Sequence, residues 1–365
     1  MNPRLFLLTL LLLLPVACKR QVEVARQTVP VVREILSDRS DPRAQLLRGR
    51  VPVSQADITI IGPEFTCDRL VEQLSFRDLQ DNVDARFVPD GLPDFAGETF
   101  VCIEDTTPYR EILEAQGAEA LRQQTVFRVL AALDTAVHIS PYDMEGLSAK
   151  ASSKLVVLAD PFLCEYGGSD VDTLFRSTLC RVPVISPIEK MIDLAFDRDE
   201  RGDLSVGVLC DAQLDSAGIY EKIFARKAAE RGRRGASLVS IGVGQRDSAL
   251  YRFLDRYQAA GYVKPLDVIL VDDLSVDVEQ LKIELAQIVS VMNESSMTLG
   301  RLVSRDFFFI DAMETVSGQC YSFLRENNMF THNIAKPQVT VYRPVRKPES
   351  KDGSIILIPG SYVQN

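Results

Sequence analysis

Aspartates stand directly after several apolar runs of this chain, where a parallel α/β protein gathers its ligand contacts. They are Asp105, Asp160, Asp211, Asp272 with Asp273, and Asp311. Ligands of such sheets bind outside the carboxyl ends of the strands, where loops and helix N-termini meet. Carboxylates there can accept hydrogen bonds from hydroxyl groups, amines or ribose. Each acid could instead cap the following helix or end its strand, but we expect at least two of them to face one cleft.

Aromatic and polar side chains follow the same strand ends and would complete a small-molecule cleft. Two aromatic rings facing each other across a cleft can stack on a sugar or base ring, although ordinary packing is the alternative for each ring. The predicted ligand-binding residues are Glu64, Phe65, Asp105, Thr106, Asp160, Phe162, Asp211, Gln213, Asp272, Asp273 and Asp311. No catalytic residue is assigned.

The cysteines suggest a different chemistry and a cross-link. Cys67 and Cys210 each lie close to a strand end, which would suit a two-lobed racemase or lyase, but Cys210 ends its strand whereas Cys67 begins a helix. Cys164 and Cys180 flank a loop-like stretch and could form a disulfide, worth roughly 3 kcal/mol on the loop-entropy argument. The chain has no CxxC pair and its two histidines lie far apart, so neither a metal site nor a cofactor is predicted.

Composition and missing motifs narrow the function further. The net charge of −10 argues against a nucleic-acid partner, because its phosphates would be repelled. Neither a serine nucleophile elbow nor a phosphate-binding P-loop is present. The G-x-G at Gly242 and Gly244 lacks a third glycine and is interpreted as a tight turn after a strand.

The acids must be positioned by a unit that occurs twice: an apolar strand, a short polar loop and an amphipathic helix. The first copy runs from residue 57 to residue 74, and the second from 204 to 224. Strands with near-continuous Val, Ile and Leu, separated by helices, are typical of parallel sheets covered on both faces. The fold class is therefore α/β, with two Rossmann-like lobes, parallel sheets and a ligand cleft between them.

The chain divides into four parts on this interpretation. Residues 1–18 are a signal peptide, 19–55 a polar spacer, 56–187 with 312–336 the first lobe, and 203–310 with 338–365 the second lobe. Within the first lobe we expect short strands at 85–88 and 136–139 and a helical stretch at 109–133 that is interrupted at Gly117.

The N-terminal sequence, with Arg4 ahead of a short apolar core, is typical of an export signal. Residues 14–18 resemble a bacterial lipobox, although Pro15 stands where that motif usually has Leu. By this resemblance Cys18 is acylated with a lipid such as palmitate, and the protein is anchored to a membrane of the bacterial cell envelope, facing the periplasm or the cell exterior. An ordinary cleaved signal is the alternative.

Taken together, the pattern resembles the type I periplasmic binding protein fold, which is also the ligand-binding module of LacI-type regulators. The resemblance rests on residues 154–160 with 182–185, on 205–211 with Gly218 to Tyr220, and on 266–273 with 306–311. It implies two lobes that close by a hinge on a solute and a cleft lined by the acids named above.

That resemblance predicts a membrane-tethered solute-binding protein, not an enzyme. It would bind a sugar, a nucleoside or an amino-acid-like molecule for uptake through an ABC importer or for sensing by a membrane protein. One alternative is a periplasmic or surface scaffold that uses a degenerate binding fold to hold a protein partner. The other is the two-lobed racemase or lyase.

Overall fold

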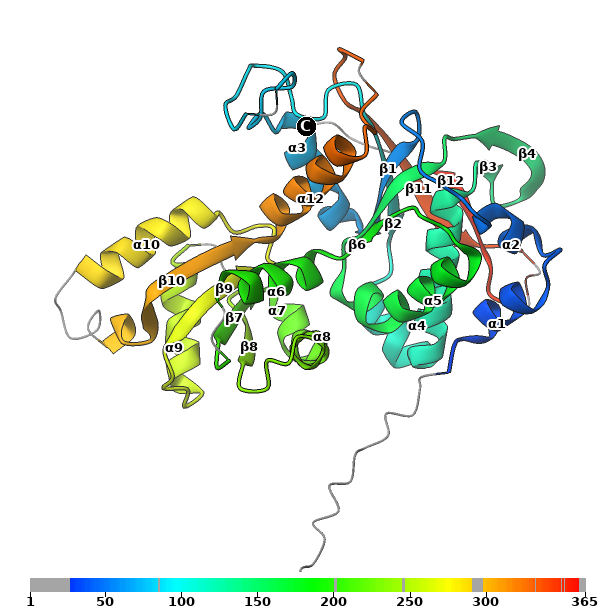
Figure 1. Cartoon of the computed structure of the whole chain (residues 1–365). Coiled ribbons are helices and arrows are strands. Elements are labelled where there is room, and N and C mark those ends of the chain that lie inside the picture. Colours follow the sequence, from blue (N-terminus) through cyan, green and yellow to red (C-terminus); the bar gives the residue numbers. More distant parts are fainter. Residues whose placement is uncertain are drawn as a thin grey trace, which may run out of the picture.

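The computed structural model describes residues 27–360, apart from residues 85, 200–201, 245–246, 291–297, 332, 349 and 351. Two α/β lobes lie side by side, joined by helices at their boundary (Figure 1). This confirms the predicted fold class of two Rossmann-like lobes with parallel sheets.

The first lobe is built on a six-stranded sheet. In spatial order its strands are β12 (Ile355–Pro359), β11 (Gln338–Arg346), β2 (Thr99–Asp105), β1 (Asp57–Pro63), β5 (Ser153–Leu158) and β6 (Val184–Ile185). All neighbouring pairs are parallel except β11 with β12. Strands β1, β2 and β5 are almost wholly buried, as expected for a parallel sheet covered on both faces.

Helices cover both faces of this sheet. Helices α3 (Glu64–Phe76) and α12 (Ala312–Glu326) pack on one face, and α4 (Tyr109–Leu133), the π-helix η1 (Leu163–Gly167) and α5 (Gly168–Thr178) on the other. The predicted interruption of α4 at Gly117 is confirmed, because this residue has φ 85° and ψ 170° within the helix. The π-helix approaches α4 so closely that a Cβ on Gly167 would lie 2.2 Å from Cβ of Thr125.

The second lobe has a four-stranded parallel sheet. Its order is β10 (Val303–Asp311), β9 (Leu266–Val271), β7 (Ser205–Cys210) and β8 (Ser237–Gly242). Helices α9 (Ala249–Ala259) and α10 (Val278–Ser290) pack on one face, and α6 (Pro187–Arg198) and α8 (Ile219–Glu230) on the other. A short helix, α7 (Ala212–Asp215), follows β7.

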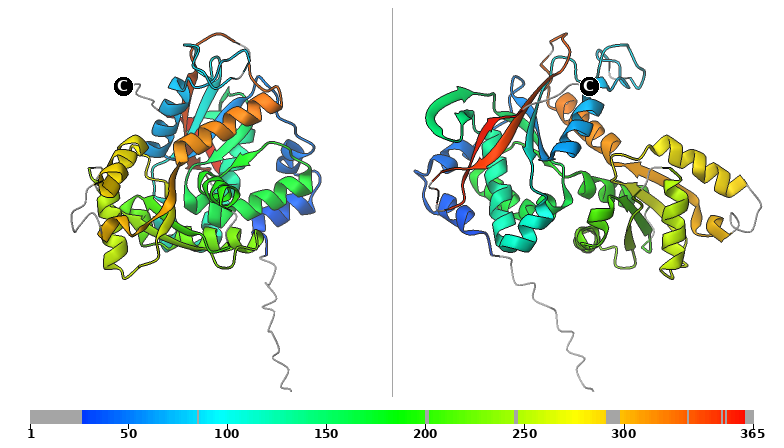
Figure 2. Two further views of the ribbon diagram at one scale, coloured as in Figure 1. Left: turned by 60° about the vertical axis from the view of Figure 1, so that its left-hand side comes forward. Right: turned by 180° about the vertical axis from the view of Figure 1, so that it is seen from behind.

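The chain passes from the first lobe to the second at α6 and returns at α12. After α12 the described part of the chain stays in the first lobe, so the assignment of residues 338–365 to the second lobe is wrong for β11 and β12, whereas residues 361–365 lie outside the described residues. Strand β11 pairs with β2, placing Val341 opposite Cys102, and β12 forms the edge of the same sheet. The right-hand view of Figure 2 shows both strands in red within the first lobe.

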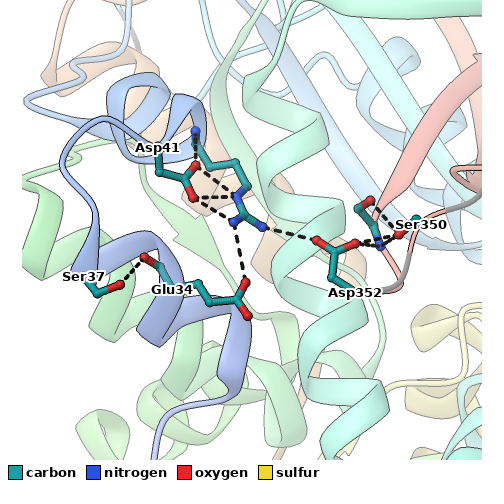
Figure 3. Close-up of polar contacts among 7 residues, drawn as sticks. Glu34, Ser37, Asp41, Ser350 and Asp352 are labelled. Carbon is teal, nitrogen blue, oxygen red and sulfur yellow. Dashed lines mark hydrogen bonds and ion pairs between the residues drawn. The ribbon is translucent and has the colours of Figure 1, made fainter.

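The predicted polar spacer is folded where the structure describes it. Helix α1 (Pro30–Ser37) buries Val31, Val32 and Ile35 in the core of the first lobe, and α2 (Pro42–Leu47) buries Leu47 there. Arg43 forms ion pairs with Asp41 (2.7 Å) and Glu34 (3.7 Å). It also reaches Asp352 (3.5 Å), in the turn between β11 and β12 (Figure 3).

The charged residues and prolines of this segment are typical of a spacer, and they obscure the apolar pattern of two short amphipathic helices. The predicted signal peptide and Cys18 lie outside the described residues. None of the helices in the described part of the chain is long and apolar enough to cross a membrane.

Two local predictions in the first lobe are corrected. Residues 86–88 are loop rather than strand, with Phe87 and Val88 exposed, and Ala85 lies outside the described residues. The short strand expected near Ala136 exists as β3 (Ala136–Ser140), but it pairs with an unforeseen strand, β4 (Asp143–Ala149), in a separate hairpin.

Candidate functional site

A cavity of about 500 Å³ lies where the carboxyl ends of the strands of both sheets face each other. Its lining comes from the segments that follow β1, β2 and β5 in the first lobe and β7, β9 and β10 in the second. A crevice outside the carboxyl ends of parallel strands is the usual ligand site of an α/β fold. We call this cavity the interlobe cleft.

Most of the predicted site residues meet in the interlobe cleft. Its lining includes Phe65, Asp105, Thr106, Asp160, Phe162, Asp211, Asp272 and Asp273. Glu64 is instead exposed in the first turn of α3. Asp311 caps α12 by accepting a hydrogen bond from the Met313 backbone N–H (2.7 Å) and lines a neighbouring cavity. The side chain of Gln213 lies outside the described part of the chain.

A larger hollow of about 850 Å³ lies among α5, α6 and α8. Its central cation, Arg226, is already ion-paired with Glu189 and Glu165. The hollow gathers fewer strand ends, so the interlobe cleft is the better candidate for chemistry.

Asp160 is the cleft acid of the first lobe whose pKa is strongly raised. It follows β5 directly, is only 8% exposed, and accepts a hydrogen bond from the backbone N–H of Phe162 (2.8 Å). Burial raises its pKa to about 7, and the negative charge of Asp105 adds to the rise. The backbone hydrogen bonds act in the opposite direction but do not cancel the cost of desolvation.

Asp272 is its counterpart in the second lobe. It follows β9, and Oδ2 accepts a hydrogen bond from the hydroxyl of the buried Tyr220 (2.8 Å). Burial raises the pKa of Asp272 to about 7, the Tyr220 hydroxyl lowers it, and the negative charge of Asp160 raises it again. The charge of Asp160 therefore acts on Asp272 from the opposite lobe, and burial gives both acids a pKa of about 7.

Asp105 behaves differently because it is neutralised. The guanidinium of the buried Arg128 donates to both of its carboxylate oxygens, from Nε at 2.8 Å and from Nη2, and the hydroxyl of Tyr109 donates to Oδ2. A bidentate pair of this kind fixes the carboxylate in position and compensates its charge. Asp105 is therefore a structural and electrostatic neighbour of Asp160 rather than a free acid.

The sequence prediction missed three residues that set these acids: Tyr109, Arg128 and Tyr220. Arg128 left a signal, because it is a single charge within the apolar run Val126 to Leu130, and a buried arginine requires a paired anion. The two tyrosines left none, since each looks like an ordinary apolar residue near the start of a helix.

The cysteines take no part in the cleft. Cys67 is fully buried, its Sγ lies 3.6 Å from the Gly62 carbonyl oxygen, and burial raises its pKa well above the ordinary value. Burial also raises the pKa of the Cys210 thiol. A raised pKa disfavours the thiolate that a cysteine mechanism requires. Cys164 and Cys180 are free, so the suggested disulfide is not formed.

Within the described residues, no group of three or more His, Cys, Asp or Glu side chains is placed to hold a metal ion. The chemistry available to the interlobe cleft is therefore argued from its carboxyl groups.

No family model and no curated protein sequence matches the chain. Among solved structures it is similar to a glutamate racemase from Bacillus anthracis (12% identity, 80% of this chain and 89% of that chain, TM-score 0.48). A glutamate racemase from Francisella tularensis in complex with D-glutamate also matches (15% identity, 82% and 91%, TM-score 0.45). An ABC-transporter solute-binding protein from Clostridium phytofermentas with bound L-rhamnose reaches a TM-score of 0.27 (11% identity, 85% and 95%).

These comparisons correct the predicted function. Glutamate racemases and an aspartate racemase homologue match with TM-scores of 0.37 to 0.48, whereas LacI-type regulators and the solute-binding protein reach 0.25 to 0.27. The prediction of a solute-binding or scaffold protein that is not an enzyme is therefore wrong. The type I periplasmic binding resemblance holds only at the coarser level of two α/β lobes. At such low identity the likeness concerns the fold, and the chemistry must come from the cleft's own residues.

Proposed function

We propose that the protein is an enzyme that moves a proton on a small molecule held in the interlobe cleft, in the manner of a racemase or epimerase. Asp160 and Asp272 would be its acid and base. The observation that carries the proposal is the placement of these two acids on opposite lobes of one cavity, with pKa values of about 7. Neither forms an ion pair with a described basic side chain, so both can change charge during a reaction.

The reaction requires one of the two acids to be ionised and the other to be protonated. The ionised carboxylate removes a proton from a substrate carbon, and the electron pair of the broken C–H bond stays on the substrate. The protonated carboxyl then donates its proton to the same carbon from the opposite lobe, forming the new C–H bond with inverted configuration. The pair ends with its proton on the other aspartate and can run the reverse reaction. General acid–base catalysis is most effective when such groups titrate near the working pH.

Hydron exchange tests this proposal directly. The protein would be incubated in D₂O with a panel of chiral carbon acids, and loss of the substrate C–H signal and of optical purity would be followed by NMR and polarimetry. We expect Asp160→Asn and Asp272→Asn each to slow exchange by about a hundredfold or more. Asp255→Asn, on the exposed side of α9, is the matched control and should retain full exchange.

Two results would refute the proposal. One is an undiminished exchange rate in both cleft variants. The other is the absence of exchange by the wild-type protein on every panel member that binds the cleft. A lyase would use the same two acids but would deliver the proton to a leaving group, so release of a fragment in place of inversion would redirect the assignment.

We also propose that the mature protein is anchored to a bacterial cell-envelope membrane by a lipid on Cys18. The support is the lipobox-like stretch at residues 14–18. Mass spectrometry should find an acylated N-terminal cysteine, and Cys18→Ser should release the protein from the membrane fraction. An unmodified N-terminus at any other residue would refute the anchor.

A further inference from the structure

Three acids that line the interlobe cleft, Asp160, Asp272 and Asp273, are held by uncharged donors. Asp160 is bound by a backbone N–H and Asp272 by a tyrosine hydroxyl. Oδ1 of Asp273 accepts hydrogen bonds from the backbone N–H (3.0 Å) and from the hydroxyl (2.6 Å) of Ser275. Neutral donors fix a carboxylate in place but leave its charge uncompensated. The cleft therefore presents negative charge to whatever enters it.

The cations near these acids are already engaged. Arg128 is committed to Asp105. Arg110 is the one basic side chain among the described residues lining the cavity, and it donates to Glu114 (2.8 Å) and to the Ser216 hydroxyl (2.9 Å). Little positive charge is therefore left in the interlobe cleft to bind an anionic ligand.

Two aromatic side chains also line the cavity. Phe65 lines the cavity although 52% of its surface is exposed. Phe162, two residues after Asp160, also lines the cavity and stacks on Tyr166 with ring centroids 6.3 Å apart. The face of an aromatic ring attracts cations and repels anions, because its quadrupole is negative there.

We infer that the interlobe cleft takes a small substrate that carries a positively charged nitrogen, such as a basic amino acid. The inference rests on the proposed function in taking the cleft as the reaction site. An ammonium group only donates hydrogen bonds, which suits a site rich in acceptors. A neutral polyol would also need free donors, and a dicarboxylate would add negative charge beside acids that are already difficult to ionise.

A cationic substrate also suits the proposed chemistry. Removing a proton from carbon leaves an electron pair, and hence negative charge, inside a cleft that is already negative. A positively charged nitrogen next to the reacting carbon offsets that charge from within the substrate. The enzyme then needs no cation of its own at this point, in agreement with the engagement of Arg110 and Arg128 elsewhere.

Three four-carbon probes of similar length separate the alternatives: 1,4-diaminobutane, succinate and erythritol. Titration calorimetry on the full folded chain should show the diamine binding about tenfold or more tightly than either of the others, with an affinity that weakens as salt is added. Asp273→Asn should weaken diamine binding severalfold while leaving the hydrogen bonds to Ser275 possible through its amide oxygen. Phe65→Leu should weaken it while keeping an apolar side chain, and Asp255→Asn should have no effect.

The inference is overturned if succinate or erythritol binds as tightly as the diamine, or if neither cleft variant changes diamine affinity while circular dichroism shows it folded. Exchange assays on L-ornithine and L-glutamate keep this outcome separate from the proposed function. Tight binding of the cation without hydron exchange at carbon would refute the proposed enzymatic function and leave the inference about the ligand intact. Binding and exchange of glutamate in preference to ornithine would do the reverse.

Discussion

Replacing Tyr220 with Phe tests the link between structure and proton transfer most sharply. The hydroxyl of Tyr220 donates a 2.8 Å hydrogen bond to Oδ2 of Asp272 from a fully buried position. It stabilises the ionised carboxylate, and so holds the pKa of Asp272 lower than burial and the charge of Asp160 would set it. Tyr220→Phe removes that hydrogen bond and keeps the ring, so the pKa should rise.

The magnitude follows from the kind of hydrogen bond involved. A hydrogen bond to a charged group contributes about 1.5–3 kcal/mol, and a pKa change of one corresponds to about 1.36 kcal/mol. Because Asp272 is half-buried and water can replace part of the lost bond, we take the lower end of that range. The pKa of Asp272 should therefore rise by about 1 from its value of about 7.

The assay is the pH dependence of hydron exchange between pH 5 and 9, with ¹³C NMR titration of labelled aspartate as a direct reading. The limb of the rate profile set by Asp272 should move to higher pH by about one pH unit. Tyr257→Phe is the matched control, because this buried hydroxyl of the same lobe donates to the Lys264 carbonyl oxygen and not to a carboxylate. A profile of Tyr220→Phe that is unmoved, or moved to lower pH, would refute the assignment of Asp272.

Three further predictions concern stability, each measured by urea unfolding. Burial raises the pKa of Asp160 from 3.8 to about 7. The protonated side chain therefore contributes folding stability that is fully present below pH 4 and is lost as the pH rises through 7. Asp160→Asn should thus stabilise the fold above pH 7, by at most about 4 kcal/mol, and have little effect below pH 4. Arg128→Met should destabilise by about 3–5 kcal/mol by stranding the buried Asp105, and adding Asp105→Asn should restore part of the loss. Gly167→Ala should cost about 1–3 kcal/mol by overpacking against α4, whereas Gly168→Ala meets no atom within 4 Å and should not.

The positions of the cleft acids could be predicted because parallel sheets constrain them. A near-continuous apolar run that ends on aspartate, as at Asp160 and Asp272, places that acid at the carboxyl edge of a buried sheet. Two such sheets facing each other then bring acids from distant parts of the chain into one cavity. Pattern alone could not separate Asp160 from Asp311, because capping of a helix depends on the exact geometry of the following turn.

What the sequence could not supply was the partner of each acid and the path of the tail. The Asp105–Arg128 pair spans most of α4, and contacts of that sequence separation leave no periodic signal. The predicted lobe of β11 and β12 was wrong because β11 is an ordinary amphipathic strand whose sequence would suit the edge of either sheet. Its choice is made by tertiary pairing with β2, which the local pattern does not encode.

The packing at the lobe boundary bears on whether the interlobe cleft closes on a ligand by a hinge or holds catalytic groups in fixed positions. Hinge closure, implied by the binding-protein resemblance, needs lobes that can move apart. Here one continuous core runs through both lobes and includes Phe162, two residues after Asp160, and Tyr220, the hydrogen-bond partner of Asp272. Moving the lobes would disturb the packing that holds both acids, at the cost of buried apolar contacts. A pair of acids fixed across a cleft in this way is preorganised, as proton transfer in both directions at one carbon requires.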